Sequence, residues 1–553
     1  MSKMITVTFA DGRTKKYAKG VSFLDISNNV ADEYRTPVVA VKIDNDIKDL
    51  QVWAEKDCRL DFLDLYTDPG IKVYQRSLTF VLIVAARELF GDCDVVVEHS
   101  LSKGLFCELF NGKEFTAADI SRLEDKMRQI IAADLPILRK VLPTHDAVAL
   151  FATDGQWEKV QLLKQLKRKT VSIYYCGAFY DYFYGTMTPR TGYLTLFELR
   201  AYGSGMILRF PEKENPGVIP PFQEQKKLSG IFQEAKRWGN ILRCGHVATW
   251  NEKVKAGNYT DIIRVAEALQ EKKIAQIADF ISSHRHQVRV ILVAGPSSSG
   301  KTTFAQRLNI QLRVNNVWPV PISLDDYFVD RCCTPLDEKG EYDFDAVEAI
   351  DLTLFNEHLT QILNGEEVNV PSYNFHTGMR EFRGHKIRIR PDQPLIIEGI
   401  HGLNERLTAA VPHDHKIKIY ISALTQLSID NHNRIPTTDA RLIRRIVRDS
   451  QFRSHDALVT LKMWPSVRRG EERNIFPFQE EADVMFNSAL IYELAVLKKY
   501  AEPLLEKVTS DFPEYSEAKR LLNFLAYFQS IEDDEIPSNS ILREFVGNSC
   551  FYK

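Results

Sequence analysis

The stretch LVAGPSSSGKTT at residues 292–303 constrains the fold more than any other part of the chain. The apolar run VRVILVAG before it has the composition of a strand at the buried centre of a parallel sheet, and the run TTFAQRLNIQL after it has a helical pattern. Gly295 to Thr302 match GxxxxGK[ST] in the strand, loop and helix order of a phosphate-binding loop. A chance glycine-rich turn is the alternative, and the agreement of all three elements argues against it. The sequence therefore predicts a doubly wound parallel α/β sheet.

Such a loop predicts a site for ATP and Mg²⁺. Its glycines let backbone N–H groups converge on phosphate oxygens at the positive end of a helix. Lys301 would reach the β- and γ-phosphates, and Thr302 would be a Mg²⁺ ligand. The residues expected to bind the nucleotide are Gly295, Pro296, Ser297, Ser298, Ser299, Gly300, Lys301, Thr302 and Thr303.

Two later apolar strands end in carboxylates. VWPVPISL leads into Asp325 and Asp326, and PLIIEGIHGL carries Glu398. A carboxylate at the carboxyl edge of such a sheet can accept the proton of an acceptor hydroxyl, so Asp325 is the candidate base, although the two aspartates could instead cap the next helix. Glu398 suits a magnesium site, because burying it for structure alone would be costly without a partner.

A run of arginines follows in ARLIRRIVRDSQFRSHD at residues 440–456. Leu442, Ile443, Ile446 and Val447 share one helical face, and the arginines lie largely elsewhere. Two interpretations remain open. The helix could be a flap that closes over a transferring phosphate, or it could be a solvated basic helix. The arginines in question are Arg441, Arg444, Arg445, Arg448 and Arg453.

In this order, the elements over about residues 289–485 resemble the uridine kinase/phosphoribulokinase family. The resemblance implies a catalytic base at Asp325 and catalytic roles for Lys301, Arg445 and Arg453, with Thr302 and Glu398 at the metal. It places a ribose-binding carboxylate on Asp345 in YDFDAVEAID and a nucleobase-contacting aromatic on Tyr373 in VPSYNFHTGMR. The acceptor half departs from the family pattern. A family histidine falls on Gly378, with His376 as a stand-in, a lid arginine falls on His455 and a glutamine falls on Met463, while Arg445 and Arg448 remain to face substrate.

The front of the chain has a different character. Ile5, Val7 and Phe9 alternate with threonines and lead into a hairpin at Asp11-Gly12, and Ser22 with Asp25 predicts a helix cap. FADGRTKKYAKGVSFLDI followed by AVKIDNDIKDL is similar to the TGS domain of threonyl-tRNA synthetases, a β-grasp fold. The segments FTAADISRLEDKMRQIIAADLPILRKVLP and PRTGYLTLFELRAYGSGMILR resemble the second domain of those enzymes, which hydrolyses mischarged tRNA.

The chemistry of that second domain depends on an HxxxH pair and a CxxxH pair. Here the four positions are Arg76, Phe80, Phe183 and Met187, so we expect the fold to remain and the editing reaction to be lost. The module could be a structural or dimerising platform, or it could sense a small molecule or RNA. The aromatic run at 174–184 lacks interleaved basic residues, so we expect core packing rather than base stacking.

Composition bears on the number of domains, on nucleic-acid binding and on the cellular compartment. A length of 553 residues predicts several domains, and a formal net charge of −3 gives no general reason to expect nucleic-acid binding. Eight scattered cysteines without a CxxC pair favour a reducing compartment. No apolar run is long enough to span a bilayer, and the first residues lack the apolar core of a signal peptide, so we expect a soluble, cytoplasmic protein.

These patterns predict a multidomain α/β and α+β chain with five segments. They are a TGS-like β-grasp domain at 1–68, an editing-like domain at 69–211, a linker and helical bridge at 212–287, a kinase-like domain at 288–485 and a helical tail at 486–553. The sequence of the tail contains no motif that indicates catalysis or binding. The leading hypothesis is an ATP- and Mg²⁺-dependent kinase that phosphorylates the 5′-hydroxyl of a pyrimidine nucleoside such as uridine. The alternative is an ATP-binding regulatory or RNA-associated protein, and a homo-oligomer fits either.

Overall fold

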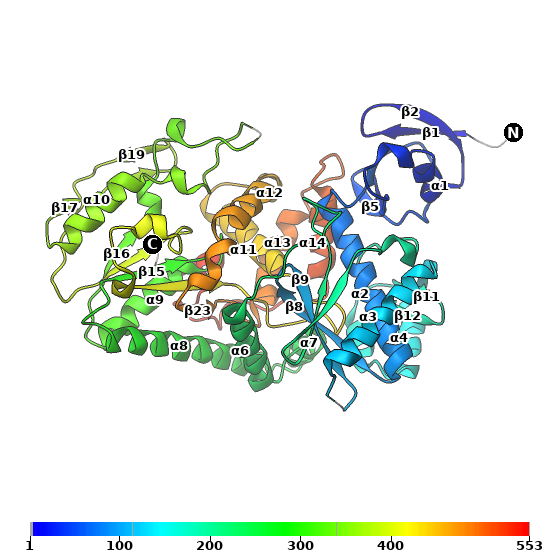
Figure 1. Cartoon of the computed structure of the whole chain (residues 1–553), viewed down its shortest axis with the longest axis horizontal. Helices are drawn as coiled ribbons and strands as arrows, with labels where there is room; N and C mark the ends of the chain where they lie inside the picture. Colours follow the sequence, from blue (N-terminus) through cyan, green and yellow to red (C-terminus); the bar gives the residue numbers. More distant parts are fainter. Residues whose placement is uncertain (1–3, 113, 339, 552–553) are drawn as a thin grey trace.

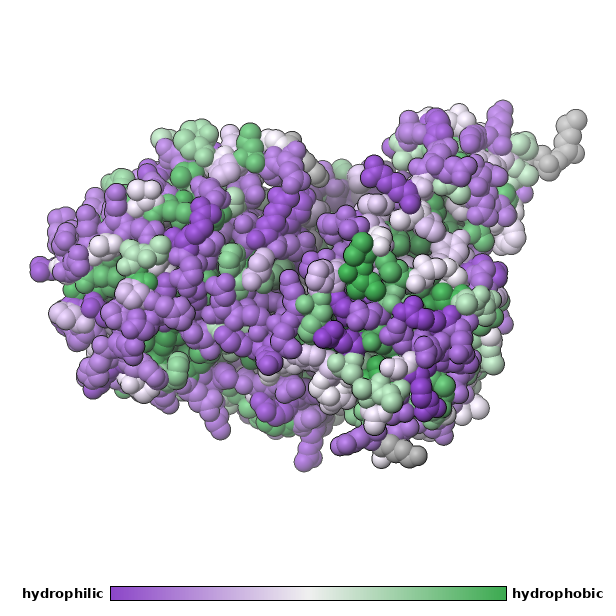
Figure 2. All heavy atoms as spheres, viewed as in Figure 1, coloured by the Kyte–Doolittle hydropathy of each residue, from purple (hydrophilic) through white to green (hydrophobic). Residues whose placement is uncertain are grey.

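The computed structural model describes residues 4–112, 114–338 and 340–551. The chain forms two lobes (Figure 1), with the N-terminal sheets in one lobe and the parallel sheet of the phosphate loop in the other. Helices α11 (Thr437–Phe452), α12 (Ala457–Asn474), α13 (Glu493–Leu505) and α14 (Tyr515–Leu525) lie between them. The N-terminal sheet projects from the rest, beside a notch, and hydrophilic side chains cover most of the face seen in Figure 2.

The first sheet has the strand order β2-β1-β7-β4-β5. Ile5, Val7 and Phe9 are buried on one face of β1, which confirms the alternation predicted from the sequence. Ser22 accepts a hydrogen bond from the backbone N–H of Asp25 and caps α1, as predicted. The elements are β1 (Met4–Phe9), β2 (Thr14–Ala18), α1 (Phe23–Asn28), β4 (Ala40–Ile43), β5 (Asp46–Lys48) and β7 (Cys58–Leu63), with β3 (Val21–Ser22) paired to β6 (Trp53–Ala54).

The second unit is built around α2 (Asp68–Phe90). The apolar run at 77–90 predicts a helix, but α2 begins nine residues earlier, because Thr67 caps it and Pro69 fits its first turn. The amphipathic pattern at 117–133 predicts a helix capped by Thr116, and the structure confirms this cap as a capping box with Asp119 on α3. Two sheets complete the unit, β13-β14-β9-β8 and β10-β11-β12. The strands and helices are β8 (Asp94–Leu101), β9 (Gly104–Phe110), α3 (Ala117–Ala132), β10 (Ile137–Pro143), α4 (Thr144–Thr153), α5 (Trp157–Gln165), β11 (Thr170–Cys176), β12 (Phe179–Tyr182), β13 (Glu198–Tyr202) and β14 (Gly205–Arg209).

Three helices occupy most of the predicted bridge: α6 (Lys226–Leu242), α7 (Val247–Lys255) and α8 (Tyr259–Ser283). The helical pattern that follows Thr260 predicts a cap at that residue, but this prediction is wrong, because α8 begins at Tyr259 and Asn258 holds the N-cap position. The stretch GHVATWNEKV, which carries no recognisable motif, forms most of α7, and its Trp250 is fully buried. The bridge is therefore part of the packed structure rather than a solvated linker.

The phosphate loop belongs to a five-stranded parallel sheet with the order β16-β21-β15-β22-β23, as the strand pattern predicted. The loop follows the central strand and leads into α9 (Lys301–Val314). The edge strand β23 runs across the predicted boundary at residue 485, so the sheet extends into the predicted tail. The strands are β15 (Val290–Ala294), β16 (Val320–Ser323), β21 (Leu395–Glu398), β22 (Lys416–Ser422) and β23 (Val484–Asn487).

One continuous hydrophobic core connects the lobes. It contains buried side chains from the second unit, the bridge, the parallel sheet and the tail, among them Phe151, Trp250, Phe486 and Leu542. The aromatic run of the second unit contributes to the two largest cores, with Tyr182 in this one and Tyr174 and Phe183 in its neighbour, so the prediction of core packing is confirmed. The predicted tail is thus an integral layer of the kinase-like lobe.

A buried charge cluster lies at the same junction. Lys159 on α5 is fully buried, 3.0 Å from Asp181 on β12 and 3.8 Å from Asp430 in the loop after β22. His432 completes the cluster, 2.7 Å from the Lys159 Nζ and 2.6 Å from Asp181. The surrounding cations hold the pKa of Asp181 well below its ordinary value, although burial opposes this. Buried charges of this kind require their partners, so the cluster fixes the second unit against the kinase-like lobe.

No helix of the described ranges is long and apolar enough to cross a membrane.

The Lys159→Met substitution should lower the free energy of unfolding by about 3–5 kcal/mol, because it leaves two buried carboxylates without their cation. Urea unfolding, followed by both tryptophan fluorescence and circular dichroism, measures the effect. Lys164→Met is the control, since Lys164 is exposed on the same helix and should change stability by less than about 0.5 kcal/mol. Equal unfolding curves for the two variants would contradict the role given to the cluster.

Candidate active site

The phosphate loop is shaped by close packing at its two glycines. A Cβ on Gly295 would lie 2.1 Å from the carbonyl oxygen of Ile421, and a Cβ on Gly300 would lie 2.5 Å from the Ile541 side chain. Gly300 also has a φ of 85°, which favours glycine. The loop closes where α9 begins, so the free N–H groups of the first helical turn point towards the site.

Lys301 and Thr302 occupy the first turn of α9. The Lys301 Nζ donates a hydrogen bond to the carbonyl oxygen of Pro296, 3.3 Å away. Burial lowers the pKa of Lys301, while the charges of Glu398 and Asp325 oppose that effect, so both carboxylates lie within electrostatic reach of the ammonium. The structure therefore brings the predicted phosphate-binding lysine together with the two predicted carboxylates.

Thr302 and Glu398 form the predicted metal pair. The Thr302 hydroxyl donates to a carboxylate oxygen of Glu398 at 3.2 Å, and Glu398 ends β21 beside the central strand. Burial and the nearby Asp325 raise the pKa of Glu398 to about 7, against the effect of Lys301. Across the described ranges, no three or more His, Cys, Asp or Glu side chains form a metal-binding group. One hydroxyl and one carboxylate fit Mg²⁺, which takes few protein ligands and completes its shell with phosphates and water.

Asp325 and Asp326 lie in the short 3₁₀ turn Leu324–Tyr327 after β16. Asp325 is accessible to solvent, yet desolvation raises its pKa, with Lys301, Arg453 and Arg448 acting in the opposite direction. Asp326 has a different task, because it accepts a hydrogen bond from the backbone N–H of Tyr373 at 3.2 Å. The two aspartates therefore have different surroundings: Asp325 faces the phosphate site, and Asp326 holds a neighbouring strand.

Helix α11 carries the arginines but is not an exposed flap. Arg441 and Arg444 are fully buried and pair with Glu471 and Glu493, respectively. Arg441 also donates to the carbonyl oxygen of Ser297 at 2.9 Å. The solvated-helix alternative is therefore wrong for this part of the chain. The flap interpretation is wrong for these two arginines, because their side chains are buried and contact the phosphate loop.

Three more arginines surround Asp449, a residue that the sequence analysis did not select. Asp449 is fully buried and lies 3.2 Å from Arg445, 2.8 Å from Arg448 and 3.7 Å from Arg453. Arg445 also donates to the Ser297 hydroxyl at 2.8 Å, and Arg453 is half exposed, with its pKa lowered to about 10 by burial and by Arg448. The spacing of Arg445 and Asp449, four residues apart on a helix, was the available signal.

The predicted acceptor residues divide into two groups. Asp345 lies within electrostatic reach of Glu471 and Arg445, two residues that contact the phosphate loop: burial and the charge of Glu471 raise its pKa to about 7, and Arg445 opposes them. Tyr373 on β18 (Ser372–Asn374) is buried, with its ring centroid 5.5 Å from that of Phe328, whereas Phe375, not selected from the sequence, is 60% exposed.

His376 lies in the exposed turn between β18 and β19 (Met379–Glu381), directly after Phe375. Nothing in the structure ties its side chain to Asp325 or Lys301. At Gly378, where the family histidine would fall, φ is 71° and a Cβ would meet Arg331 at 2.7 Å, so a larger residue would be strained. The departure from the family pattern is built into the backbone of this turn.

The predicted tail also contributes to the site. Glu544 on α15 (Arg543–Val546) accepts hydrogen bonds from the backbone N–H and the hydroxyl of Thr303, at 3.2 and 2.9 Å. This carboxylate lies on the N-terminal turn of α9, where free N–H groups would bind a phosphate. The tail therefore brings a carboxylate to the candidate site, in addition to packing against the kinase-like lobe. No sequence pattern pointed to Glu544, because 241 residues separate it from its partner.

The four positions of the degenerate editing site also come together, and three of them belong to the hydrophobic core. Phe80, Phe183 and Met187 are buried, and the rings of Phe80 and Phe183 lie 5.7 Å apart, edge to face. Arg76 lies beside them and donates to the carbonyl oxygen of Thr186 at 2.6 Å. Buried apolar side chains occupy three of these positions, and a guanidinium occupies the fourth.

Comparison with known proteins agrees with both parts. Residues 290–493 match the model of the Phosphoribulokinase / Uridine kinase family. The N-terminal region matches threonine–tRNA ligases: the ligase of a Janthinobacterium species is 26% identical over 278 residues, which are 50% of this chain and 40% of that ligase. The ligase of Coxiella burnetii is 30% identical over 197 residues, which are 35% of this chain and 30% of that protein. The chain thus spans less than half the length of the curated relatives it matches.

Among solved structures, one described as a possible uridine kinase from Bacillus stearothermophilus is 18% identical, with a TM-score of 0.26, and the match covers 38% of this chain and 97% of that one. The 278 matched ligase residues exceed the 211 of the predicted synthetase-like front, so that match extends into the bridge helices.

The family match and the phosphate loop define residues 290–493 as a P-loop region similar to the Phosphoribulokinase / Uridine kinase family. The whole chain joins this region to one similar to part of the threonine–tRNA ligases.

The Asp345→Asn substitution should change how stability depends on pH. The pKa of Asp345 is raised in the folded protein, so its contribution to stability is complete below the unfolded pKa of 3.8 and is lost as pH rises through about 7. Asparagine does not titrate, so the melting temperature of the variant relative to the wild type should increase between pH 5 and pH 8. Thermal melts across that range measure the difference. Parallel curves would contradict it, and Asp392→Asn, at an exposed carboxylate, is the control.

Proposed function

We propose that the protein is an ATP- and Mg²⁺-dependent kinase that transfers phosphate to the hydroxyl of a small molecule, with the 5′-hydroxyl of a pyrimidine nucleoside as the leading acceptor. The observation that carries the proposal is the placement of Asp325, accessible to solvent and within electrostatic reach of Lys301 and the metal pair. A hydrolase needs only to position water, whereas transfer to an alcohol needs a base for the hydroxyl proton.

Each part of the site has a role in this reaction. The N–H groups of the loop and Lys301 bind the phosphates of ATP and hold them in line with the acceptor. Thr302 and Glu398 would hold Mg²⁺, which neutralises charge on the phosphates when bound. Asp325 accepts the hydroxyl proton, and Arg448 and Arg453 stabilise charge on the transferring group.

The acceptor would lie on the side of Asp345. Its carboxylate can accept hydrogen bonds from ribose hydroxyls, and Arg445 steadies it electrostatically. Phe375 offers an exposed ring, and Tyr373 supports it at a centroid distance of 5.1 Å. A flat base stacked on Phe375 is therefore a better fit than one on the buried ring of Tyr373.

The Asp325→Asn variant should lower kcat with the acceptor by about 10²- to 10⁴-fold, since it removes the base, while the Kd for ATP stays near the wild-type value. ADP release measured over a panel of nucleosides and other small alcohols identifies the acceptor first. Asp392→Asn is the matched control, because it makes the same change at an exposed carboxylate far from the site. Unchanged turnover in Asp325→Asn would remove Asp325 as the base.

A second candidate rests on the match to threonine–tRNA ligases. The protein could be an ATP-binding regulator that uses its synthetase-like region to contact RNA. The same assay separates the two functions. ADP release stimulated by tRNA alone would favour the regulator, and stimulation by one small alcohol would favour the kinase.

The Glu544→Ala substitution should tighten ATP binding by about tenfold, because a carboxylate no longer occupies the N–H of Thr303. Titration of the full-length protein with a fluorescent ATP analogue measures the Kd. Glu535→Ala serves as the control, since Glu535 is an exposed carboxylate of the same tail. Weaker ATP binding in Glu544→Ala would mean that the carboxylate supports the loop rather than competing with phosphate.

A further inference from the structure

A cavity of about 830 Å³ lies between the two lobes, away from the phosphate loop. Its walls come from α2 and the turn after β12 on one side, and from α11, α12 and α14 on the other. The cavity includes Arg76 and Phe183, two of the positions at which the editing chemistry is lost. Its volume is that of a pocket for a small organic molecule.

The charges of its lining are not balanced. Every lining carboxylate except that of Glu514 has a basic partner within 4.0 Å. In the part of the chain that the structure describes, four lining cations have no carboxylate within that distance: Lys72, Arg76, Arg168 and Lys462. The unmatched charge is therefore positive, and it favours an anionic occupant.

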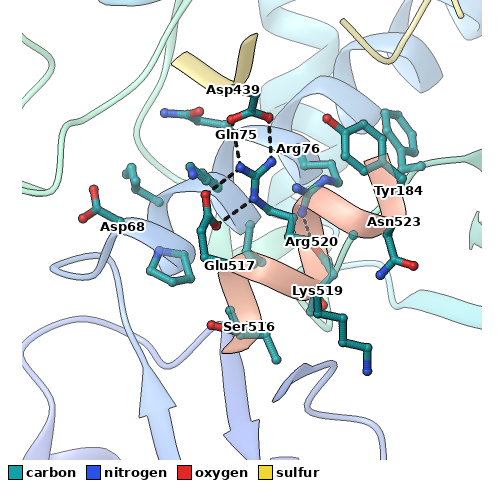
Figure 3. Close-up of a pocket in the computed structure, with 18 of the residues that line it drawn as sticks. Asp68, Gln75, Arg76, Tyr184, Asp439, Ser516, Glu517, Lys519, Arg520 and Asn523 are labelled. Atoms are coloured by element: carbon teal, nitrogen blue, oxygen red, sulfur yellow. Dashed lines mark hydrogen bonds and ion pairs between the residues drawn. The ribbon is translucent and has the colours of Figure 1, made fainter. Parts of the chain in front are cut away.

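Arg76 is the best placed of these cations. Its guanidinium lies among Tyr184, Asn523 and Arg520 (Figure 3), and its hydrogen bond to the carbonyl oxygen of Thr186 uses one of five N–H donors. Gly185 has a φ of 130°, and a Cβ there would lie 2.6 Å from the Arg76 Cζ, so the glycine makes room for the guanidinium. Burial and the neighbouring Arg520 lower the pKa of Arg76. An oxyanion would satisfy both the free donors and the unpaired charge.

Arg520 does not compete for that anion. Both of its terminal nitrogens bind Asp439, at 2.6 and 2.8 Å, and it also binds Glu517 on its own helix (Figure 3). Asp439 is in the first turn of α11, the helix whose Arg441 and Arg445 contact Ser297 of the phosphate loop. One helix therefore has its first turn at the cavity and the following turns against the loop.

Helix α12 makes a second connection. Arg468 and Glu472 line the cavity, and Arg468 binds Glu471 at 3.0 Å. Glu471 in turn accepts a hydrogen bond from the backbone N–H of Ser297 at 3.1 Å. On α12, Glu471 therefore connects the cavity residue Arg468 to the backbone of the phosphate loop. On α11, the cavity residue Asp439 lies on the same helix as Arg441 and Arg445, which contact that loop.

We propose that this cavity binds a small organic oxyanion, a phosphate ester or a carboxylate, through Arg76, and that α11 and α12 transmit its occupancy to the phosphate loop. The binding part stands independently of the proposed function. The second part rests on it, because the effect is measured through ATP.

The binding test uses the full-length protein carrying Lys301→Ala, which weakens the loop's own affinity for phosphate. Inorganic phosphate and acetate are titrated separately by calorimetry. At least one should bind, and adding Arg76→Gln should weaken that binding about tenfold, whereas Arg76→Lys should keep part of it. Arg122→Gln, at an exposed arginine of the same lobe, should leave it unchanged. Binding of phosphate alone would identify a phosphate ester as the class, and binding of acetate would identify a carboxylate.

Two outcomes would overturn the site: no binding of either probe, or binding that is the same in Arg76→Gln and Arg122→Gln. Circular dichroism checks that each variant is folded, and Arg76→Lys keeps the test decisive should glutamine disturb the fold.

Transmission to the loop is tested with Lys301 intact. The Kd for a fluorescent ATP analogue should change about fivefold when the bound probe is saturating, and Arg76→Gln should abolish the change. An ATP Kd that does not respond to the probe would refute transmission. If the protein binds no ATP at all, the proposed function fails, and the calorimetric result for Arg76 is unaffected.

Discussion

The pairing of buried charges along α11 is the constraint on which the rest of the structure depends. Arg441 and Arg444 lie in the interior because Glu471 and Glu493 neutralise them, and a single unpaired guanidinium there would be far too costly to bury. Each of the two arginines also donates one hydrogen bond to a carbonyl oxygen of the phosphate loop. The loop conformation, the position of the tail and the contact between lobes all follow from where this helix lies.

Much of the phosphate site could be predicted from sequence because its parts are local. The loop, its lysine and the ends of the parallel strands follow from short patterns, and the structure brings Lys301, Asp325 and Glu398 within electrostatic range. The spacing of four residues from Arg445 could also have indicated Asp449, but the family resemblance assigned no role to that residue. Glu544 was not within reach, because its contact with Thr303 joins segments that no periodicity connects. The same limit applies to the cavity, whose walls come from helices far apart in sequence.

Domain boundaries were harder to predict than single helices and strands, because they too depend on contacts between segments far apart in sequence. Local propensity identified α3 and its capping box, and it identified the alternation of β1. It placed a domain boundary inside β23, because strand pairing is decided by tertiary contacts. It also treated residues 212–287 as a connection, whereas Trp250 and its neighbours lie in the largest core. Composition could not show that the face of α7 with Trp250 lies in that core.

The core shared between the lobes has a consequence for how such a chain can change over generations. One region resembles part of a tRNA ligase and the other matches the Phosphoribulokinase / Uridine kinase family, yet Phe151, Trp250 and Phe486 occupy the same interior. A new side chain at any of these positions is acceptable only if residues of the other region accommodate it. Core substitutions in one region must therefore be compatible with those in the other region.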